Sequence, residues 1–522
     1  MELKVIYKNA RCAVVEIADG GQYSTRETWK VYLNQKLVME TDRVINSLYH
    51  LEPDTQYQVT VENEAGERAM TYFSTEYEYV TLDVKRFGAK GDGISDDTLF
   101  IQAAIMACPP LSRVLIPAGT YRITTLFLKD NISIELDKDA VLSAFTDRSR
   151  FPVFDGIIQS YDEQDEYNLG TWEGNPLPMF TGIITGVNVK NAVIYGQGTI
   201  EGNASFDEDN WWYNPKVMRG AFRPRMLFLE RCRNIVVQGI TVQNSPSWNI
   251  HPYFSDHLRF IDLKVMNPKK SPNTDGLDPE SCQDVEIVGV YFSLGDDCIA
   301  VKSGKIYMGA TYKRASKDIV IRQCCMRDGH GSVTIGSEMA GGVKNLTVRD
   351  CVFLHTDRGL RIKTRRGRGK DAVVEGVLFE NIHMDNVLTP FVVNCFYFCD
   401  PDGHTEYVRT KETLPVDDRT PAIRTLTFRN IEAENCHVAA AYMYGLPEQK
   451  IDRVEMENVH VTYAEQPEYG QPAMMEGCDE HTSRQGIYAN NIEELVLRNV
   501  TVEGQEGPAV VTENIGNLET DM

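Results

Sequence analysis

The hexapeptide IVVQGI at residues 235–240 decides the fold, because its pattern of apolar and polar residues returns eight more times along the chain. The pattern reads apolar, any, apolar, polar, polar or glycine, apolar, and the nine copies start at residues 235, 258, 285, 319, 346, 377, 426, 454 and 495. The starts lie 23 to 49 residues apart, and most gaps fall between 23 and 34. Such a period is typical of a solenoid whose inserts form loops between the units.

Each copy reads as a two-faced strand rich in β-branched residues, and no helical linker separates the copies. Leucine-rich repeats would be more regular and richer in leucine. The pattern therefore predicts a right-handed parallel β-helix, an all-β fold in which each coil places one strand about 4.8 Å above the last. The fifth position, often Asn, Asp or Gly, suits a bend in the coil. Two copies break the polar fourth position with Ile261 and Val288.

Residues 1–78 precede the repeats and read as a separate module. Short runs such as KVIYK, CAVVEI and QYQVTVEN alternate apolar and polar residues between turn signals, which predicts a small β-sandwich. The segment LEPDTQYQVTV (residues 51–61) resembles the fibronectin type III pattern, in which a Tyr, here Tyr57, packs at the sandwich corner. Another small all-β module is the alternative, and nothing in the segment indicates catalysis.

Residues 79–522 are predicted to form the β-helix domain, which opens with a glycine- and aspartate-rich stretch followed by a short helix. Asp96 and Asp97 are placed to cap that helix, and the spacing of the apolar residues approximates a 3.6-residue period at Leu99, Ile101, Ala104 and Ile105. The segment RVLIPAGTYRI (residues 113–123) then reads as strand, turn and strand. We expect the helix to plug the first coil, because an open stack of coils needs a cap.

Composition narrows the function classes. The chain of 522 residues carries a formal net charge of −22, which argues against binding to nucleic acid or to an anionic membrane surface. The first residues show no export signal and no stretch approaches the roughly 18 apolar residues of a membrane span. A reduced cytoplasmic protein is predicted, or a secreted or periplasmic one if a leader has been removed.

The cysteine pattern gives no sign of a metal site. The 12 cysteines show no repeated C-x-x-C pairs, so no zinc site is predicted. Three of them, Cys298, Cys324 and Cys351, fall at positions where we expect them to stack inside the coil rather than to react.

Polar residues follow the strands of four consecutive copies. The segment SLGDDCIAVKSG (residues 293–304) places Asp296 and Asp297 side by side, which is unusual beside an apolar strand. The preceding copy is followed by Asp275, the next by His330, and the one after by Arg361 and Lys363. Residues one coil apart in sequence become neighbours in a β-helix, so these side chains are expected to line one face, although their offsets from the strand starts differ.

Four motifs in this order resemble the polygalacturonase family of glycoside hydrolases, which cleave pectin and have a right-handed parallel β-helix fold. The motifs are SPNTDGLD, GDDCIAVKSG, GHGSVTIGSE and RGLRIKTRRG, and FGAKGDGISDDT and IPAGTYRI are similar to the opening segment of the family. The resemblance covers about residue 80 to the end. The amino-terminal module is similar to the fibronectin-type module of some bacterial exo-acting members.

The resemblance implies a role for each site residue. Asp296 would be the general acid, while Asp275 and Asp297 would position and deprotonate the water, with inversion at the anomeric carbon. Three clustered carboxyl groups cannot all ionise easily, so one of them would hold its proton to higher pH. His330 would adjust the pKa of the carboxyl group that holds this proton. Substrate binding would fall to Asn273, Arg361 and Lys363, and neither a metal nor a cofactor is implied.

Each motif has a plainer interpretation when taken alone. An Asp-Asp pair or an Asn-Thr-Asp-Gly stretch is usually a solvated turn, and alternating Arg361 and Lys363 would be an exposed strand face. The basic run RIKTRRGRGK (residues 361–370) reads either as a solvated loop or as a positive patch for a polyuronate. The stretch NWWYNP (residues 210–215) predicts equally a sugar-stacking loop and a loop packed on the solenoid.

Several functions remain open at the sequence level. The full set of motifs favours hydrolysis of a homogalacturonan backbone, with exo-action if segments 151–225 and 364–373 close one end of the cleft. Endo-action, or a rhamnogalacturonan or xylogalacturonan substrate, is the alternative. A pectate-lyase-type β-helix and a non-catalytic carbohydrate-binding β-helix are further alternatives. The predicted partner is a pectic polysaccharide or oligogalacturonide, and the oligomeric state is left open.

Overall fold

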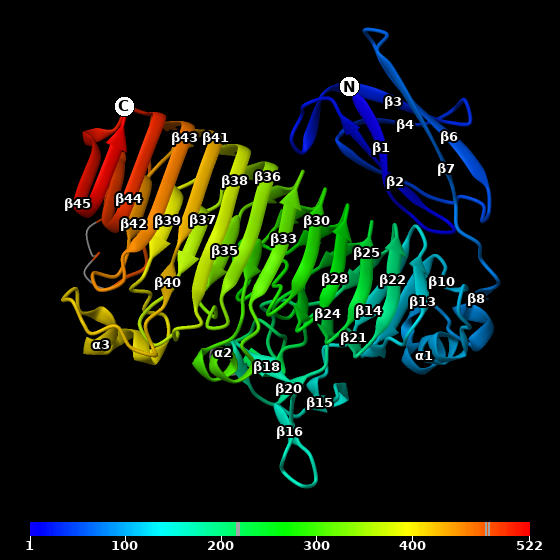
Figure 1. The fold of residues 1–522 in the computed structure, drawn as a ribbon. Helices are drawn as coiled ribbons and strands as arrows, with labels where there is room; N and C mark the ends of the chain where they lie inside the picture. The colour runs from blue at the N-terminus through cyan, green and yellow to red at the C-terminus, as the bar shows by residue number, and fades with distance from the viewer. Residues whose placement is uncertain (216–219, 476–477, 479–480) are drawn as a thin grey trace.

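The nine hexapeptides form parallel strands that stack in register, as the repeat predicts. Ile235 pairs with Leu258, Leu258 with Val285 and Val285 with Ile319. The first residue of every later copy pairs with the first residue of the copy before it. The computed structural model describes residues 1–215, 220–475, 478 and 481–522, and within them the stacked strands build the parallel β-helix shown in Figure 1.

Three strand faces wind around one core. The first face, which holds the hexapeptides, comprises β10 (Arg113–Ile116), β13 (Ile132–Leu136), β22 (Lys190–Gly196), β25 (Arg233–Gln238), β28 (Asp256–Ile261), β30 (Gln283–Val288), β33 (Ser316–Arg322), β36 (Val343–Leu354), β38 (Val373–Asp385), β41 (Thr425–Cys436), β43 (Ile451–Tyr463), β44 (Gln485–Glu503) and β45 (Glu506–Thr520). The second comprises β9 (Asp92–Asp96), β11 (Gly119–Ile123), β14 (Ala140–Ala144), β23 (Thr199–Glu201), β26 (Thr241–Gln243), β29 (Lys264–Met266), β31 (Tyr291–Ser293) and β34 (Cys325–Arg327), and then the second halves of the long strands.

The third face carries the residues of the candidate site. It comprises β12 (Leu126–Phe127), β21 (Ile184–Val187), β24 (Leu227–Glu230), β27 (Ile250–Tyr253), β32 (Ile299–Val301), β35 (Val333–Gly336), β37 (Arg358–Lys363), β39 (Thr389–Asn394) and β42 (Ala439–Tyr444). Short strands within residues 153–180 form small hairpins outside the coils, and the hairpin of β16 (Ile157–Gln159) and β17 (Glu166–Asn168) projects from the body of the molecule (Figure 1).

The fifth residue of each hexapeptide makes the predicted bend. All nine have positive φ angles between 47° and 79°, the region that Gly, Asn and Asp tolerate best: Gly239, Asp262, Gly289, Gln323, Asp350, Asn381, Asn430, Asn458 and Asn499. On the later coils the amide side chains form a ladder, with Asn499 donating to Asn458 at 2.8 Å and Asn458 donating to Asn430 at 2.9 Å. The bend therefore carries its own hydrogen bonds from coil to coil.

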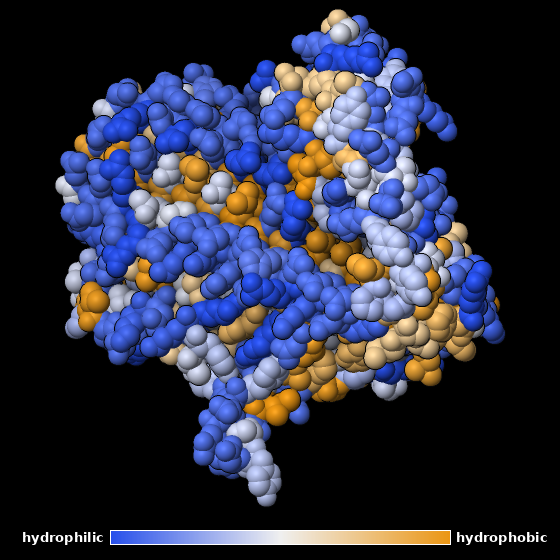
Figure 2. All heavy atoms as spheres, turned by 45° about the vertical axis from the view of Figure 1, so that its right-hand side comes forward, coloured by the Kyte–Doolittle hydropathy of each residue, from blue (hydrophilic) through white to orange (hydrophobic). Residues whose placement is uncertain are grey.

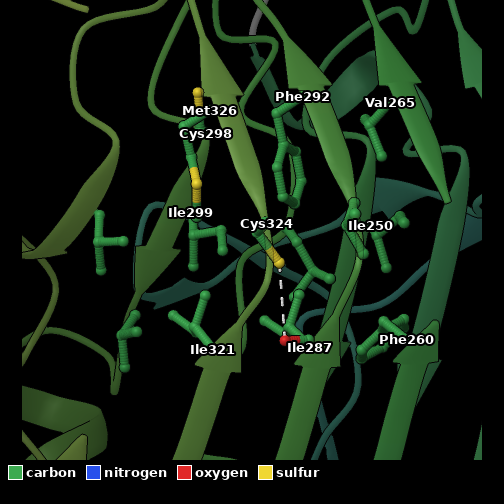
Figure 3. Packing of buried hydrophobic residues seen from close by; sticks show 14 of the residues in the cluster. Ile250, Phe260, Val265, Ile287, Phe292, Cys298, Ile299, Ile321, Cys324 and Met326 are labelled. Atoms are coloured by element: carbon green, nitrogen blue, oxygen red, sulfur yellow. Dashed lines mark hydrogen bonds between the residues drawn. The ribbon is translucent and has the colours of Figure 1, made fainter. Parts of the chain in front are cut away.

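The interior of the coils is apolar and close-packed (Figure 3). Cys298, Cys324 and Cys351 are fully buried there, which confirms their predicted position. The Cys324 thiol lies 3.7 Å from the carbonyl oxygen of Ile287 on the preceding coil, and burial raises the pKa of Cys298 and Cys351. These thiols are packing groups rather than reactive ones.

Helix α1 (Thr98–Ala107) covers the first coil, as predicted, with Ile101, Ala104 and Ile105 buried in the solenoid core. Two details of the prediction are wrong. Leu99 is 80% exposed, because it lies on the outer side of the helix. The Asp97 carboxylate does not cap the helix but accepts backbone hydrogen bonds from the preceding glycine-rich loop, whereas Asp96 accepts one from the Thr98 amide at 3.0 Å.

The amino-terminal module is a β-sandwich of two antiparallel sheets. One sheet holds β1 (Glu2–Lys8), β2 (Ala13–Ala18) and β5 (Ile45–Leu48), and the other holds β4 (Lys36–Arg43), β3 (Ser24–Leu33), β6 (Gln56–Asn63) and β7 (Arg68–Ser74). Tyr57 Oη accepts a hydrogen bond from the Glu52 amide at 2.9 Å, which is the corner contact expected of such sandwiches. Assignment to the fibronectin type III class and the boundary at residue 78 stay predictions.

The two irregular hexapeptides lie under this module. Ile261 and Val288 are fully buried in a cluster with Val14, Val44 and Ile45 of the sandwich. Figure 2 shows hydrophobic residues in the hollow where the module meets the solenoid. The two departures from the polar fourth position are therefore apolar contacts with the module.

Glycine at the bend of two coils also makes room for the module. A Cβ atom at Gly239 would lie 2.0 Å from Tyr49 Oη, and one at Gly289 would lie 2.7 Å from the Ile45 side chain. Between these two bends, Asp262 accepts a hydrogen bond from Ser47 at 2.5 Å. The solenoid face and the module thus fit each other at the level of single atoms.

No helix among the described residues is long and apolar enough to cross a membrane. The cytoplasmic location stays a prediction.

Candidate active site

The register of the third face aligns the predicted site residues. Leu277, Ile299, Val333 and Leu360 pair successively and form one row of this face. Counted back from that row, Asp275, Asp297 and Arg358 lie two residues before it, and Asp296, His330 and Asp357 lie three residues before it. Backbone hydrogen bonds continue the ladder into these turns, from Gly276 to Asp297 at 3.0 Å and from Ser332 to Arg358 at 2.8 Å.

Offsets from the hexapeptides did not show this alignment. The loops between the second and third faces differ in length from coil to coil. The number of residues between a hexapeptide and the site residue that follows it therefore differs between coils. When positions are counted from the third face instead, the polar residues of successive coils fall at the same positions, side by side in the structure.

The three aspartates form one cluster. A carboxylate oxygen of each of Asp275, Asp296 and Asp297 lies within 4.8 Å of the other two. Asp275 and Asp297 are 4% and 1% exposed, whereas Asp296 is only partly buried and borders the cleft. The Asp297 amide donates to Asp296 Oδ1 at 2.9 Å, which orients the Asp296 carboxyl group.

Asp297 is held by two cations from β37, which belongs to a single later coil. Lys363 Nζ lies 2.8 Å from its Oδ2 atom, and Arg361 Nη1 lies 3.2 Å from its Oδ1 atom. Burial alone would favour the neutral acid, but these two cations outweigh it and hold the pKa of Asp297 below its usual range. Asp297 is therefore a permanent anion with both oxygens occupied.

Asp275 lies in a different environment, which sequence reasoning missed. Lys302 Nζ lies 3.8 Å from Asp275, 3.8 Å from Asp278 and 3.1 Å from Glu338. Burial and the neighbouring carboxyl groups Asp278 and Asp296 raise the pKa of Asp275, and burial raises the pKa of Asp278 to about 7. The cluster thus combines one ionised carboxylate with a pair that tends to hold a proton.

His330 lies at the rim of the cluster, with its side chain 53% exposed. Its Nδ1 atom lies 2.7 Å from Asp357 Oδ2, one coil further along in the same column. The hydrogen bond to Asp357, together with the charge of Asp296, raises the pKa of His330 against the effect of its partial burial. His330 is therefore biased toward the imidazolium form beside Asp296.

Asn273, Arg361 and Lys363 were predicted to bind the substrate. The Asn273 amide oxygen accepts a hydrogen bond of 2.6 Å from Arg223, a second basic residue that the sequence did not single out. Arg361 and Lys363 both line the cleft, but their ion pairs are with Asp297. All three residues lie at the cluster, so the structure brings the whole predicted set together.

Two hollows of about 580 Å³ and 850 Å³ meet at the aspartate cluster. Asp296, His330, Asn273 and Glu173 line both hollows. The first also contains the cationic side chains Arg358, Arg361 and Lys363, and the second contains Arg223, Lys269 and Lys270. Asp296 therefore lies at the junction of a continuous cleft that carries positive charge on both sides.

One wall of the cleft is formed by residues 464–475 and 481–484, between β43 and β44. Arg361 Nη2 lies 2.7 Å from the Met474 sulfur, Arg358 donates to the Gln471 carbonyl at 2.7 Å, and Asn394 donates to the Met474 carbonyl at 2.8 Å. This segment, which we call the β43–β44 loop, was not recognised in the sequence because its composition is ordinary.

The basic run 361–370 is neither a solvated loop nor an open positive patch. Arg365, Arg366 and Arg368 are 1%, 1% and 3% exposed. Arg365 pairs with Asp400 at 2.6 Å, and Arg366 pairs with Glu448 at 2.6 Å and donates to several carbonyl groups of residues 407–412. These arginines fasten the segment between β39 and β41 against the coils, and only Lys370 of the run remains a solvated side chain.

The tryptophans of NWWYNP do not offer a sugar-stacking surface. Trp211 and Trp212 are 0% and 3% exposed, and Trp211 packs edge-on against Phe151 and Phe180. The interpretation of this stretch as a loop packed on the solenoid is correct. Trp248, which the sequence did not single out, is the tryptophan that lines the first hollow.

Clustered carboxylates can attract a cation, but the chain supplies positive charge itself. Lys363 and Arg361 bind the two oxygens of Asp297, and Lys302 lies beside Asp275. Acid–base chemistry by protonated and ionised carboxyl groups is what this arrangement supports best.

Comparison with known proteins relates the chain to one group of enzymes. The sequence model described as "Glycosyl hydrolases family 28" matches residues 132–482, and one described as "Rhamnogalacturonase A/epimerase, pectate lyase-like" matches residues 81–136. A probable polygalacturonase of Vitis vinifera is 30% identical over 386 residues, which cover 72% of this chain and 73% of that protein. An endo-polygalacturonase of Pectobacterium carotovorum is 29% identical over 384 residues, or 70% of this chain and 85% of that protein.

Solved structures share the fold. The family 28 exopolygalacturonase of Yersinia enterocolitica superposes with a TM-score of 0.72 at 18% identity, covering 100% of this chain and 99% of that one. An exopolygalacturonase of Thermotoga maritima superposes with a TM-score of 0.60 at 21% identity, covering 85% of this chain and 93% of that one. At these identities the superpositions establish the parallel β-helix and not the activity.

Proposed function

The chain belongs to the glycosyl hydrolases family 28, and we propose that it hydrolyses α-1,4-galacturonosyl linkages of polygalacturonate or oligogalacturonides. One observation carries the proposal. The cluster of Asp275, Asp296 and Asp297 lies at the junction of a cleft with cationic side chains on both sides, in a chain whose net charge is −22. A polyuronate is the sugar polymer whose charge matches such a cleft.

The proposed mechanism uses the carboxyl groups in separate roles. Asp296, which borders both hollows, protonates the leaving glycosidic oxygen. A carboxylate on the other side of the cluster takes a proton from the attacking water, and Asp275 and Asp297 hold that water. The fixed negative charge of Asp297 also stabilises the oxocarbenium-like transition state. The imidazolium of His330 stabilises Asp296 once it has given up its proton.

Inversion at the anomeric carbon is also part of the proposal, in a cluster more compact than is usual for inverting glycosidases. The nearest oxygens of the cluster lie within 4.8 Å, whereas inverting glycosidases typically separate their carboxyl groups by about 6.5–9.5 Å. Proton NMR of the first product formed decides the matter. An α-linkage cleaved with inversion releases the β-anomer, and initial release of the α-anomer would overturn this part of the mechanism.

Recognition of the substrate carboxylate is assigned to Arg361, Lys363 and Asn273. The guanidinium of Arg361 offers the paired donors that match a carboxylate, and Lys363 adds a point charge. Both cations also contact Asp297, and both line the hollow where a galacturonate would lie.

We propose exo-action, because the described part of the β43–β44 loop forms the wall of the cleft on the side of the later coils. Relatives of both kinds, endo and exo, match the chain, so family membership does not decide this point. The loop contacts at Arg358, Arg361 and Asn394 support a cleft that is closed at that end. An enzyme of this shape would remove one or two residues from a chain end.

The experiment is reducing-sugar release from polygalacturonate, with the products sized over time. Galacturonate or digalacturonate as the sole early product supports the proposal, and an early mixture of longer oligomers would instead indicate endo-action. Parallel assays on rhamnogalacturonan and xylogalacturonan test the substrate. Product absorbance in the ultraviolet that disappears with a chelator would indicate a lyase, and binding of oligogalacturonate without turnover would indicate a carbohydrate-binding protein.

A further inference from the structure

Lys302 occupies an unusual position behind the aspartate cluster. It follows β32, five residues after Asp297, and its side chain is 4% exposed. Its Nζ atom contacts Glu338 at 3.1 Å and lies 3.8 Å from both Asp275 and Asp278, with the Trp248 ring 4.6 Å away. A buried ammonium group is costly unless it is paired, so these carboxyl groups hold it in place.

Asp278 has no hydrogen-bond donor for its carboxyl group. Its side chain is fully buried, and neither oxygen accepts a hydrogen bond from any residue that the structure describes. The carboxyl group lies against that of Asp275. Two carboxyl groups in contact repel each other when both are ionised, and one proton between them converts the repulsion into a hydrogen bond.

The balance of charges at the site also favours one proton between Asp275 and Asp278. Four carboxyl groups contact three cations here, the acids being Asp275, Asp278, Asp297 and Glu338 and the cations being Lys302, Arg361 and Lys363. Four negative and three positive charges leave one negative charge in a buried site. The Asp275–Asp278 pair therefore has room for one proton, and a proton taken from the attacking water balances the charges of the set.

Asp297 is poorly suited to accept a proton from water. Lys363 and Arg361 occupy its two oxygens, so a proton would have to displace a cation. Asp275 has no such pair of direct bonds, because Lys302 stays 3.8 Å away and bonds to Glu338 instead.

We propose that Lys302 and Asp278 are positioning residues that act through Asp275, the carboxylate that takes the proton from the attacking water. This inference rests on the proposed function. In the step, an O–H bond of water breaks, its oxygen bonds to the anomeric carbon, and the proton moves to Asp275, which shares it with Asp278. The bond between the anomeric carbon and the leaving oxygen breaks, and the proton of Asp296 moves to that oxygen. Exchange with solvent then restores both groups, and Lys302 keeps Asp275 available in its ionised form.

The pH at which Asp275 ionises depends on all the charged groups that face it. Asp278 comes from the same coil, Asp296, Asp297 and Lys302 from the next, and Arg223 from the preceding side. Among them, Lys302 favours the ionised form of Asp275, and Asp278 opposes it. The two residues should therefore move the titration of Asp275 in opposite directions.

The test compares the pH profiles of kcat for Lys302→Met and Asp278→Asn on an oligogalacturonide. The acidic limb reports ionisation of the base in the substrate complex. Lys302→Met removes a cation, so the limb should move to higher pH by about one unit or more, together with a fall in kcat. Asp278→Asn removes a competing acid, so the limb should move to lower pH by a similar amount. Lys302→Arg keeps the charge and should restore much of the shift.

Arg322→Met is the matched control, because Arg322 is also a buried cation between two carboxylates, Glu16 and Glu286, but on another face of the coil. Its acidic limb should stay in place. The inference would be overturned if the acidic limbs of the kcat profiles of Lys302→Met and Asp278→Asn stayed in place or moved in the same direction. If Lys302→Met does not fold, Glu338→Gln replaces it, since freeing Lys302 for Asp275 should move the limb to lower pH. An inactive unaltered enzyme would refute the proposed function rather than this inference.

Discussion

Lys363 Nζ lies 2.8 Å from Asp297 Oδ2, although the two residues belong to coils separated by the coil of His330. With Arg361 it neutralises a carboxylate that is 1% exposed. The contact fastens three coils together at the centre of the cleft. Stability and catalysis therefore depend on the same ion pair.

Lys363→Met should destabilise the protein by about 3–5 kcal/mol at pH 7, because it leaves a buried carboxylate with less compensation. The pKa of Asp297 is lowered in the folded protein, so its contribution is fully present above the unfolded value of about 4 and is lost as the pH falls below it. The difference between variant and unaltered protein should shrink below pH 4. Urea unfolding at several pH values measures it, and a difference independent of pH would contradict the assignment.

Asp296→Asn should reduce kcat on polygalacturonate by about 10²- to 10⁴-fold, the usual contribution of a general acid, with little change in KM. Initial rates of reducing-end release measure this effect. Asp284→Asn is the matched control, because that side chain is 68% exposed and contacts His257 away from the cleft. Hydrolysis by Asp296→Asn at a near-normal rate would show that another group donates the proton.

Asp357→Asn should move the alkaline limb of kcat/KM to lower pH. The hydrogen bond that His330 donates to the Asp357 carboxylate raises the pKa of His330, so the loss of this bond lets the imidazolium deprotonate at lower pH. The charged form of His330 is present below its pKa and disappears as the pH rises through it. An unchanged limb would mean that the charge of His330 is not needed. Titration of the histidine by NMR checks the pKa itself.

Replacing residues 468–474 of the β43–β44 loop by a short Gly-Ser link should lengthen the early products. The change removes the contacts that Met474 and Gln471 make with Arg361 and Arg358. Chain ends would then no longer be required for binding, so the viscosity of a polygalacturonate solution should fall faster per bond cleaved. Unaltered product sizes would show that the loop does not determine where the enzyme cuts.

Gly239→Asn should destabilise the protein by about 1–3 kcal/mol, the usual cost of overpacking. Asn is common at this bend, but here a Cβ atom would lie 2.0 Å from Tyr49 Oη of the module. Asn458→Gly at the same position, on a coil beyond those that pack on the module, should cost no more than about 1 kcal/mol. Urea unfolding compares the two, and equal effects would mean that the module does not depend on this fit.

Repeat pattern alone predicted the fold down to the pairing of single residues. The first residues of all nine hexapeptides pair in sequence order, from Ile235 with Leu258 to Val454 with Leu495. This was possible because every hexapeptide has the same pattern of buried apolar positions, and that pattern fixes the register. The four motifs likewise named the residues that meet in the cleft.

The residues that sequence reasoning missed act through tertiary contacts. Lys302 and Asp278 lie within quoted motifs, but neither spacing nor composition distinguishes a buried lysine from an exposed one. Asp357 became visible only when the register of the third face was known. The same is true of the buried arginines 365, 366 and 368, because their partners Asp400 and Glu448 are far away in sequence.

The fit between module and solenoid limits how this protein can have evolved. Solenoids gain and lose length by duplication or deletion of whole coils. A coil inserted between Val236 and Val288 would separate side chains that must meet Val14, Val44 and Ile45 together. Duplications should therefore be confined to coils that make no contact with the module, and the coils of Val236, Ile261 and Val288 should descend as one block.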